Sequence, residues 1–153
     1  MRVAVGCDHA GTPLREIVAD ALRAAGHEPV DLGVADDYPD IALTVGSAVA
    51  GGDCERGVLV CGSGAGVAVA ACKIEGVRAQ AIHDEYTAHQ AVEHDDVNVL
   101  CLGARVIGPV VAGELVTRWA NARFSGEERH VRRLAKVLEI EREGLAAELD
   151  GIT

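Results

Sequence analysis

The sequence predicts a doubly wound α/β domain, in which helices cover both faces of a parallel sheet. Short apolar runs alternate with amphipathic stretches along most of the chain of 153 residues. These short runs are apolar throughout, which is typical of strands that are buried on both faces of a parallel sheet. A composition of 49% hydrophobic and only 3% aromatic residues suffices for one core of Val, Ala, Leu and Ile, so residues 1–153 are expected to form a single domain.

The first half of the chain accounts for three strands and two helices. The apolar run near the start predicts a strand over 3–6, and the amphipathic stretch after it predicts a helix over 13–25. The same alternation predicts a strand over 28–32, a helix over 40–50 and a strand over 57–60.

The second half continues in the same way. A helix is expected over 64–72, then a strand over 78–82 and a helix over 85–94. A last apolar run predicts a strand over 98–102, and a helix over 109–121 follows it. The expected result is a five-stranded parallel sheet in a three-layer, Rossmann-like α/β/α domain.

The C-terminal part of the chain has a different pattern. After Phe124 a charged helical segment is expected over 128–148, which is strongly polar for the end of a chain. Residues from about 125 to 153 are therefore expected to form a helical arm that packs on a partner subunit.

Charge and cysteine usage narrow the class of function. The formal net charge of −10 argues against a nucleic-acid surface, although a local basic patch near the C-terminus can still bind a small anion. The five cysteines have no C-x-x-C spacing and the N-terminus leads straight into the first strand, so a reducing, cytoplasmic location is expected. No apolar stretch reaches membrane-spanning length without a glycine or a charge, so no membrane partner is expected.

The most informative motif is Cys61-Gly62-Ser63-Gly64-Ala65-Gly66, which lies between an expected strand and an expected helix. Glycines let the backbone approach a ligand closely and point its N–H groups inward, and the helix N-terminus adds a partial positive charge, so this turn is suited to hold an anion. The same field stabilises a thiolate at Cys61, which makes chemistry at this site possible. Neither the nucleotide P-loop nor the dinucleotide fingerprint fits the spacing. The alternative is a plain glycine-rich turn with Cys61 as a small buried apolar residue.

Two polar loops are expected to share one crevice. The first strand ends in Gly6-Cys7-Asp8-His9 and the third ends at Cys61. If the strand order begins 2-1-3, both loops lie beyond the carboxyl ends of adjacent strands, where ligands bind in open α/β sheets. The alternative for Asp8 and His9 is a turn followed by a helix cap.

Histidines and arginines supply further candidates. His83, His89 and His94 are separated by six and five residues, a spacing that does not stack two imidazoles on one helix face, so no metal site is expected. Arg129 and Arg133 are four residues apart on an expected helix and are placed to clamp one phosphate. The alternative for this basic segment is a solvated face that pairs with neighbouring glutamates.

Taken together, these residues resemble those of the ribose-5-phosphate isomerase type B family, which also contains allose-6-phosphate and galactose-6-phosphate isomerases. The resemblance covers roughly residues 1–138 and rests on six motifs: Gly6-Cys7-Asp8-His9, Asp37-Tyr38-Pro39, Cys61-Gly62-Ser63-Gly64-Ala65-Gly66, Asn98-Val99-Leu100, Gly103-Ala104-Arg105-Val106, and Arg129-His130 with Arg133. It implies a homodimer or tetramer with active sites shared between subunits, and neither a metal nor an organic cofactor.

The resemblance also implies a role for each candidate residue. Cys61 resembles the family's base that moves a proton between C1 and C2, and His94 resembles the acid that helps open the sugar ring. The implied substrate contacts are Asp8 and His9 for the sugar, Gly62, Ser63, Gly64, Ala65 and Gly66 for the enediolate oxygens, and Arg105, Arg129 and Arg133 for the phosphate.

Three positions bear on the choice of substrate. One branch of the family uses a glutamate just after the glycine turn as its base, and Val67 at that position leaves Cys61 as the only candidate. Asp95 and Cys72 each stand where the family usually has Asn. A carboxylate only accepts hydrogen bonds, so Asp95 is expected either to pair with a cation, Arg105 being the first choice, or to accept from a hydroxyl of the substrate.

The sequence therefore predicts an aldose–ketose isomerase of phosphorylated sugars, with D-ribose 5-phosphate as the first substrate. A hexose 6-phosphate or a tetrose 4-phosphate is the alternative. A flavodoxin-like or receiver-like binding module and a catalytically silent partner subunit are the remaining alternatives. A receiver would have several acidic residues at the end of its first strand, where this chain has Asp8 alone.

Overall fold

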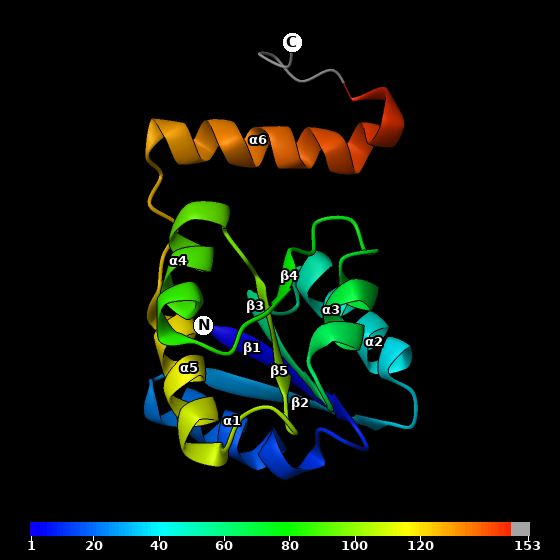
Figure 1. Ribbon diagram of the computed structural model, residues 1–153, viewed down its shortest axis with the longest axis vertical. Helices are drawn as coiled ribbons and strands as arrows, with labels where there is room; N and C mark the ends of the chain where they lie inside the picture. The colour runs from blue at the N-terminus through cyan, green and yellow to red at the C-terminus, as the bar shows by residue number, and fades with distance from the viewer. Residues whose placement is uncertain (148–153) are drawn as a thin grey trace.

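The computed structural model describes residues 1–147 and confirms the predicted α/β class (Figure 1). The strands are β1 (Arg2–Asp8), β2 (Glu28–Ala35), β3 (Arg56–Cys61), β4 (Ala79–Ala81) and β5 (Val99–Gly103). The helices are α1 (Thr12–Ala24), α2 (Tyr38–Ala50), α3 (Ala65–Ala71), α4 (Glu85–Asp95), α5 (Pro109–Asn121) and α6 (Glu128–Glu143). All strand pairs are parallel and the order is β2-β1-β3-β5-β4, which confirms the 2-1-3 start.

Helices pack on both faces of the sheet and bury a separate apolar cluster on each. Helices α1, α4 and α5 cover one face, where Leu22, Leu100 and Trp119 are fully buried. Helices α2 and α3 cover the other face, where Val45 and Leu59 are fully buried. The continuous apolar strands of the sequence are explained by this double coverage, since each strand must bury both rows of side chains.

The observed elements differ from the expected ones mainly at their ends. Strand β2 runs to Ala35 rather than to residue 32, and β4 is the short edge strand Ala79–Ala81 rather than residues 78–82. The arm helix α6 ends at Glu143, because Gly144 has a φ of +57° and so leaves the helical conformation. A short 3₁₀ turn, Gly144–Ala146, follows it. The expected helix end at residue 148 lies outside the described residues.

Helix α6 lies apart from the three layers, across the amino-terminal edge of the sheet (Figure 1). The linker before it follows the end of α4, since the Ser125 N–H donates to the Glu93 carbonyl over 3.0 Å. The N–H of Gly76, which precedes β4, donates to a Glu141 carboxylate oxygen over 3.1 Å. Both contacts place the arm at the edge where the strands begin.

Candidate active site

Cys61 is held by the glycine turn that follows β3. The Gly64 N–H donates a hydrogen bond to Cys61 Sγ over 3.1 Å, and the side chain is only 5% exposed. Gly64 has a φ of +81°, which a residue with a side chain rarely adopts, and it immediately precedes α3. The turn therefore fixes the Cys61 sulfur at the carboxyl end of β3, with a backbone N–H pointing at it.

The turn lies against the end of β5 and the loop after it. A Cβ at Gly103 would meet the Ser63 backbone at 2.6 Å, so only glycine permits this approach. The Arg105 N–H donates to the Gly62 carbonyl over 3.0 Å. A Cβ at Gly62 would lie 3.5 Å from the Arg105 guanidinium, so this cation stands directly over the turn.

The loop after β1 lies beside the same turn, as the strand order predicted. A Cβ at Gly62 would lie 3.7 Å from the Cβ of Ala10. The buried Asp8 uses Oδ1 to accept from the N–H groups of Ala10 and Gly11, so it performs the turn-forming role that was the alternative to sugar binding. His9 is exposed, and its Nδ1 lies 3.1 Å from the Asp36 carbonyl oxygen.

Two residues at this edge had no assigned role in the sequence reasoning. Tyr38 begins α2, and its ring would meet a Cβ at Gly66 at 3.1 Å, so it covers the far end of the glycine turn. The Gly103 N–H donates to His83 Nε2 over 2.9 Å, and burial lowers the pKa of His83. His83 immediately follows the strand expected over 78–82. Its position in the sequence therefore already indicated that it lies at the carboxyl edge of the sheet, near the turn.

A second cluster forms where α4 ends and α6 begins. The rings of His94 and His130 stack with their centroids 4.0 Å apart and their planes at 25°. Gln90 Nε2 lies 3.1 Å from His94 Nδ1, so the amide donates and the neutral His94 ring carries its proton on Nε2. Arg129 and Arg133 are exposed on the first turns of α6 beside this stack.

Arg129 is engaged in a surface ion pair. Its Nε lies 2.9 Å from a Glu127 carboxylate oxygen, and both side chains are more than half exposed. This is the pairing with a neighbouring glutamate that was the alternative to phosphate binding. Exposed ion pairs contribute little, about 0–1 kcal/mol, so this contact does not prevent Arg129 from binding another anion.

The two clusters lie at opposite edges of the sheet. Helix α4 starts after the carboxyl end of β4 and returns to the amino end of β5, so His94 lies at the edge where strands begin. Cys61 lies at the carboxyl end of β3. The structure therefore does not bring His94, Arg129 or Arg133 to Cys61 within one chain. For the same reason, the first of the two alternatives for Asp95, an ion pair with Arg105, is not formed within one chain.

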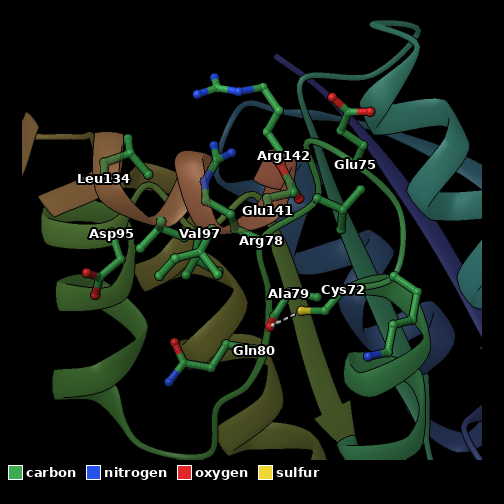
Figure 2. A pocket seen from close by; sticks show the side chains of 14 residues that line it. Cys72, Glu75, Arg78, Ala79, Gln80, Asp95, Val97, Leu134, Glu141 and Arg142 are labelled. Carbon is green, nitrogen blue, oxygen red and sulfur yellow. Dashed lines mark hydrogen bonds between the residues drawn. The ribbon is translucent and has the colours of Figure 1, made fainter. Parts of the chain in front are cut away.

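Asp95 and Cys72 line one cavity of about 700 Å³ between α6 and β4 (Figure 2). Cys72 Sγ donates to the Ala79 carbonyl over 3.1 Å, and Asp95 lies on the α4 side of the cavity. The neighbouring Asp96, rather than Asp95, forms the ion pair with Arg78, at 2.7 Å. Both departures from the family pattern thus lie at the amino-terminal edge, on the side of His94.

Three other thiols are buried and have a raised pKa, which disfavours their reactive thiolate form. Burial is the main cause that raises the pKa of Cys7, Cys54 and Cys101, with the largest effect at Cys101. Within residues 1–147, no group of three or more His, Cys, Asp or Glu side chains is arranged to hold a metal ion. None of the helices in that range is long and apolar enough to cross a membrane.

The fold and the Cys61 cluster define an α/β protein with a thiol and a glycine turn at the carboxyl edge of its sheet, where ligands bind in this class. Comparison with known families makes the assignment specific. The chain belongs to the ribose/galactose isomerase family, whose model matches residues 3–137. It is therefore an aldose–ketose isomerase.

Individual relatives agree with the family assignment. The chain is 38% identical to ribose-5-phosphate isomerase B of Escherichia coli over 144 residues, which cover 92% of this chain and 96% of the relative. It is 37% identical to D-erythrulose-4-phosphate isomerase of Pectobacterium atrosepticum over 131 residues, which cover 82% and 86%. The crystal structure of ribose-5-phosphate isomerase B from Mycoplasma genitalium with bound ribulose 5-phosphate matches with a TM-score of 0.85 and 37% identity, covering 93% of this chain and 97% of that one.

Proposed function

We propose that this protein interconverts D-ribose 5-phosphate and D-ribulose 5-phosphate, with Cys61 as the base. The observation that carries the proposal is the hydrogen bond from the Gly64 N–H to Cys61 Sγ, within a turn whose other N–H groups and Arg105 offer donors to an anion. The relatives that are named ribose-5-phosphate isomerase B, and the solved relative with ribulose 5-phosphate bound, support this substrate.

The proton transfer between C1 and C2 uses the thiolate and the turn. The Cys61 thiolate removes the proton from C2 of the open aldose, and the electron pair moves to form a C1–C2 double bond with an oxyanion on C1. The thiol returns the proton to C1 while the hydroxyl proton of O2 moves to O1, which leaves a ketone at C2. Backbone N–H groups of the glycine turn stabilise the enediolate, because they are fixed before charge develops.

Ribose 5-phosphate exists mainly as a ring, so an opening step must precede proton transfer. We assign this step to His94. His94 Nε2–H donates a hydrogen bond to O4 and stabilises the negative charge that develops there as the C1–O4 bond breaks. O4 takes up a proton from solvent and the C1 hydroxyl releases its proton to solvent, which leaves an aldehyde at C1. The amide of Gln90 donates to Nδ1 and so keeps the ring proton of His94 on Nε2.

His94 must come from a second copy of the chain, because it lies at the opposite edge of the sheet from Cys61. A homodimer in which the carboxyl edge of one copy meets the α4–α6 corner of the other would unite Cys61 and Arg105 with His94, Arg129 and Arg133. The α6 arm supports this assembly, since Val131, Val137, Leu138 and Ile140 on it are large, apolar and at least a third exposed. Charge-assisted contacts from the arginines would then hold the phosphate away from the reacting carbons.

A tetrose 4-phosphate is the second candidate substrate. The similarity to D-erythrulose-4-phosphate isomerase is nearly as high as to the ribose-5-phosphate isomerase, and Asp95 adds a carboxylate beside His94 where the family pattern has an amide. Five free cysteines support a reducing, cytoplasmic location. The N–H groups of the turn can stabilise the enediolate, so we propose that the reaction needs no metal or organic cofactor.

The test is Cys61→Ala, with Cys54→Ala, at a free thiol outside both clusters, as the matched control. Loss of the base should lower kcat for ribose 5-phosphate by roughly a hundredfold or more with little change in KM, while Cys54→Ala keeps its activity. Wild-type activity should also survive dialysis against a chelator. Near-normal turnover by Cys61→Ala would show that the base lies elsewhere, and activity restored only by a divalent ion would overturn the cofactor proposal.

A further inference from the structure

His130 is buried at a place where burial carries a cost. Its side chain is 1% exposed, and its Nε2 has no hydrogen-bond partner within the described residues. A buried polar atom without a partner destabilises a fold, and an apolar side chain of similar size would avoid that cost. The buried Nε2 atom of His130 therefore adds nothing to the stability of the arm, which points to a role other than stability.

The contacts of His130 all lead to the end of α4. Its Nδ1 lies 2.6 Å from Ser125 Oγ, and that oxygen also accepts from the Glu127 N–H over 3.1 Å. The Ser125 N–H donates to the Glu93 carbonyl, one residue before His94. The plane of the His130 ring is thereby fixed relative to the backbone that carries His94.

The His130 ring then presents one flat face to His94, 4.0 Å away and within 25° of parallel. Gln90 holds the Nδ1 edge of His94, and His130 holds its face. Two such contacts restrict both rotation about the Cα–Cβ bond and tilt of the imidazole, which leaves Nε2 as its remaining polar atom. A catalytic group misplaced by about 1 Å loses roughly a hundredfold in rate. Restriction of the His94 ring is therefore expected to raise the rate of the step that uses it.

We propose that His130 is a positioning residue, whose stacked ring aims His94 at the ring oxygen of the sugar and so serves the ring-opening step alone. This inference rests on the proposed role of His94. It also means that the phosphate contacts and the proton transfer by Cys61 do not depend on the stack.

The test separates ring opening from proton transfer with two measurements on the same pair of sugars. Isomerisation of ribose 5-phosphate requires the ring to open. Exchange of the C1 hydrogen of ribulose 5-phosphate with deuterium in D₂O requires only the enediolate, because this ketose has its O5 blocked by phosphate and stays open. Both are followed by NMR, with His94→Asn as the reference variant and Arg132→Ala, an exposed neighbour on α6, as the control.

His130→Ala should lower kcat/KM for isomerisation about tenfold to a hundredfold and leave the exchange rate within about twofold. His130→Phe, which keeps an aromatic face, should restore isomerisation to within about threefold of wild type. Size-exclusion elution and the thermal midpoint of each variant show whether fold and assembly are kept.

Four outcomes overturn the inference. The stack does not position His94 if His130→Ala loses isomerisation and exchange equally, or if it loses neither. The same conclusion follows if His130→Phe is as impaired as His130→Ala. In each of these cases, a selective loss of isomerisation in His94→Asn still upholds the proposed function. If His94→Asn itself shows no selective loss, the ring-opening role of His94 is wrong, and the inference fails with it.

Discussion

The Arg105 backbone N–H donates to the Gly62 carbonyl over 3.0 Å, and its guanidinium stands 3.5 Å from where a Cβ at Gly62 would lie. One cation is thus fixed over the glycine turn by the same chain that carries Cys61. The other two candidate phosphate ligands, Arg129 and Arg133, stand on α6 at the opposite edge. A phosphate held by all three arginines must therefore be held by two copies of the chain.

The arginines of α6 should act on substrate binding rather than on chemistry. Arg129→Ala and Arg133→Ala should each raise KM for ribose 5-phosphate roughly tenfold with kcat nearly unchanged, because the phosphate contact is the same in the ground state and the transition state. Arg118→Ala, an exposed arginine on α5, is the matched control and should change neither. An unchanged KM in both α6 variants would leave these residues as a solvated basic face.

Asp95 should influence which sugar is preferred. A carboxylate next to His94 can accept from a sugar hydroxyl but cannot donate to an enediolate oxygen, whereas an amide can do both. Asp95→Asn should raise kcat/KM for ribose 5-phosphate relative to erythrose 4-phosphate, measured across a panel of tetrose, pentose and hexose phosphates. A variant with the wild-type ratio over that panel would show that Asp95 does not set specificity.

Stability should fall as pH is lowered through the histidine range. His83 Nε2 accepts from the Gly103 N–H only when unprotonated, and burial is the main cause that lowers its pKa in the fold below its ordinary 6.5. The unfolded chain therefore binds more protons than the folded chain in this pH range. The stability that unprotonated His83 contributes is fully present above about pH 6.5 and is lost as the pH falls towards the lower pKa of the folded state.

The thermal midpoint measured between about pH 7.5 and 5 tests this, because Asp and Glu titrate below that window. His83→Gln keeps an acceptor that does not titrate and should flatten the profile. Burial also lowers the pKa of His130. Part of the dependence of the thermal midpoint on pH should therefore remain in His83→Gln, and it should disappear in the double variant His83→Gln/His130→Phe. A slope that both changes leave intact would place the titrating group elsewhere.

The order of elements and the glycine turn were predictable from sequence, because each depends on local signals. Continuous apolar runs require coverage on both faces, and alternating glycines after a strand indicate a turn with left-handed backbone, as at Gly64 with its φ of +81°. The positions of Tyr38 and His130 were not predictable from sequence. Tyr38 covers Gly66, which is distant from it in the sequence, and His130 reaches His94 only because the α6 arm packs against the end of α4. The edge on which His94 lies follows from chain direction, because a helix that leaves the carboxyl edge of a parallel sheet must return to the amino edge.

The central claim is that each active site combines the Cys61 cluster of one copy with the His94, Arg129 and Arg133 cluster of another. The most direct measurement mixes two impaired proteins, Cys61→Ala and the double variant Arg129→Ala/Arg133→Ala, assayed at low substrate concentration. A mixed dimer contains one site with every residue intact, so equimolar mixing with full exchange should restore about a quarter of wild-type activity. No recovery, with subunit exchange demonstrated by mass spectrometry, would contradict the claim and show that each site is built within one chain.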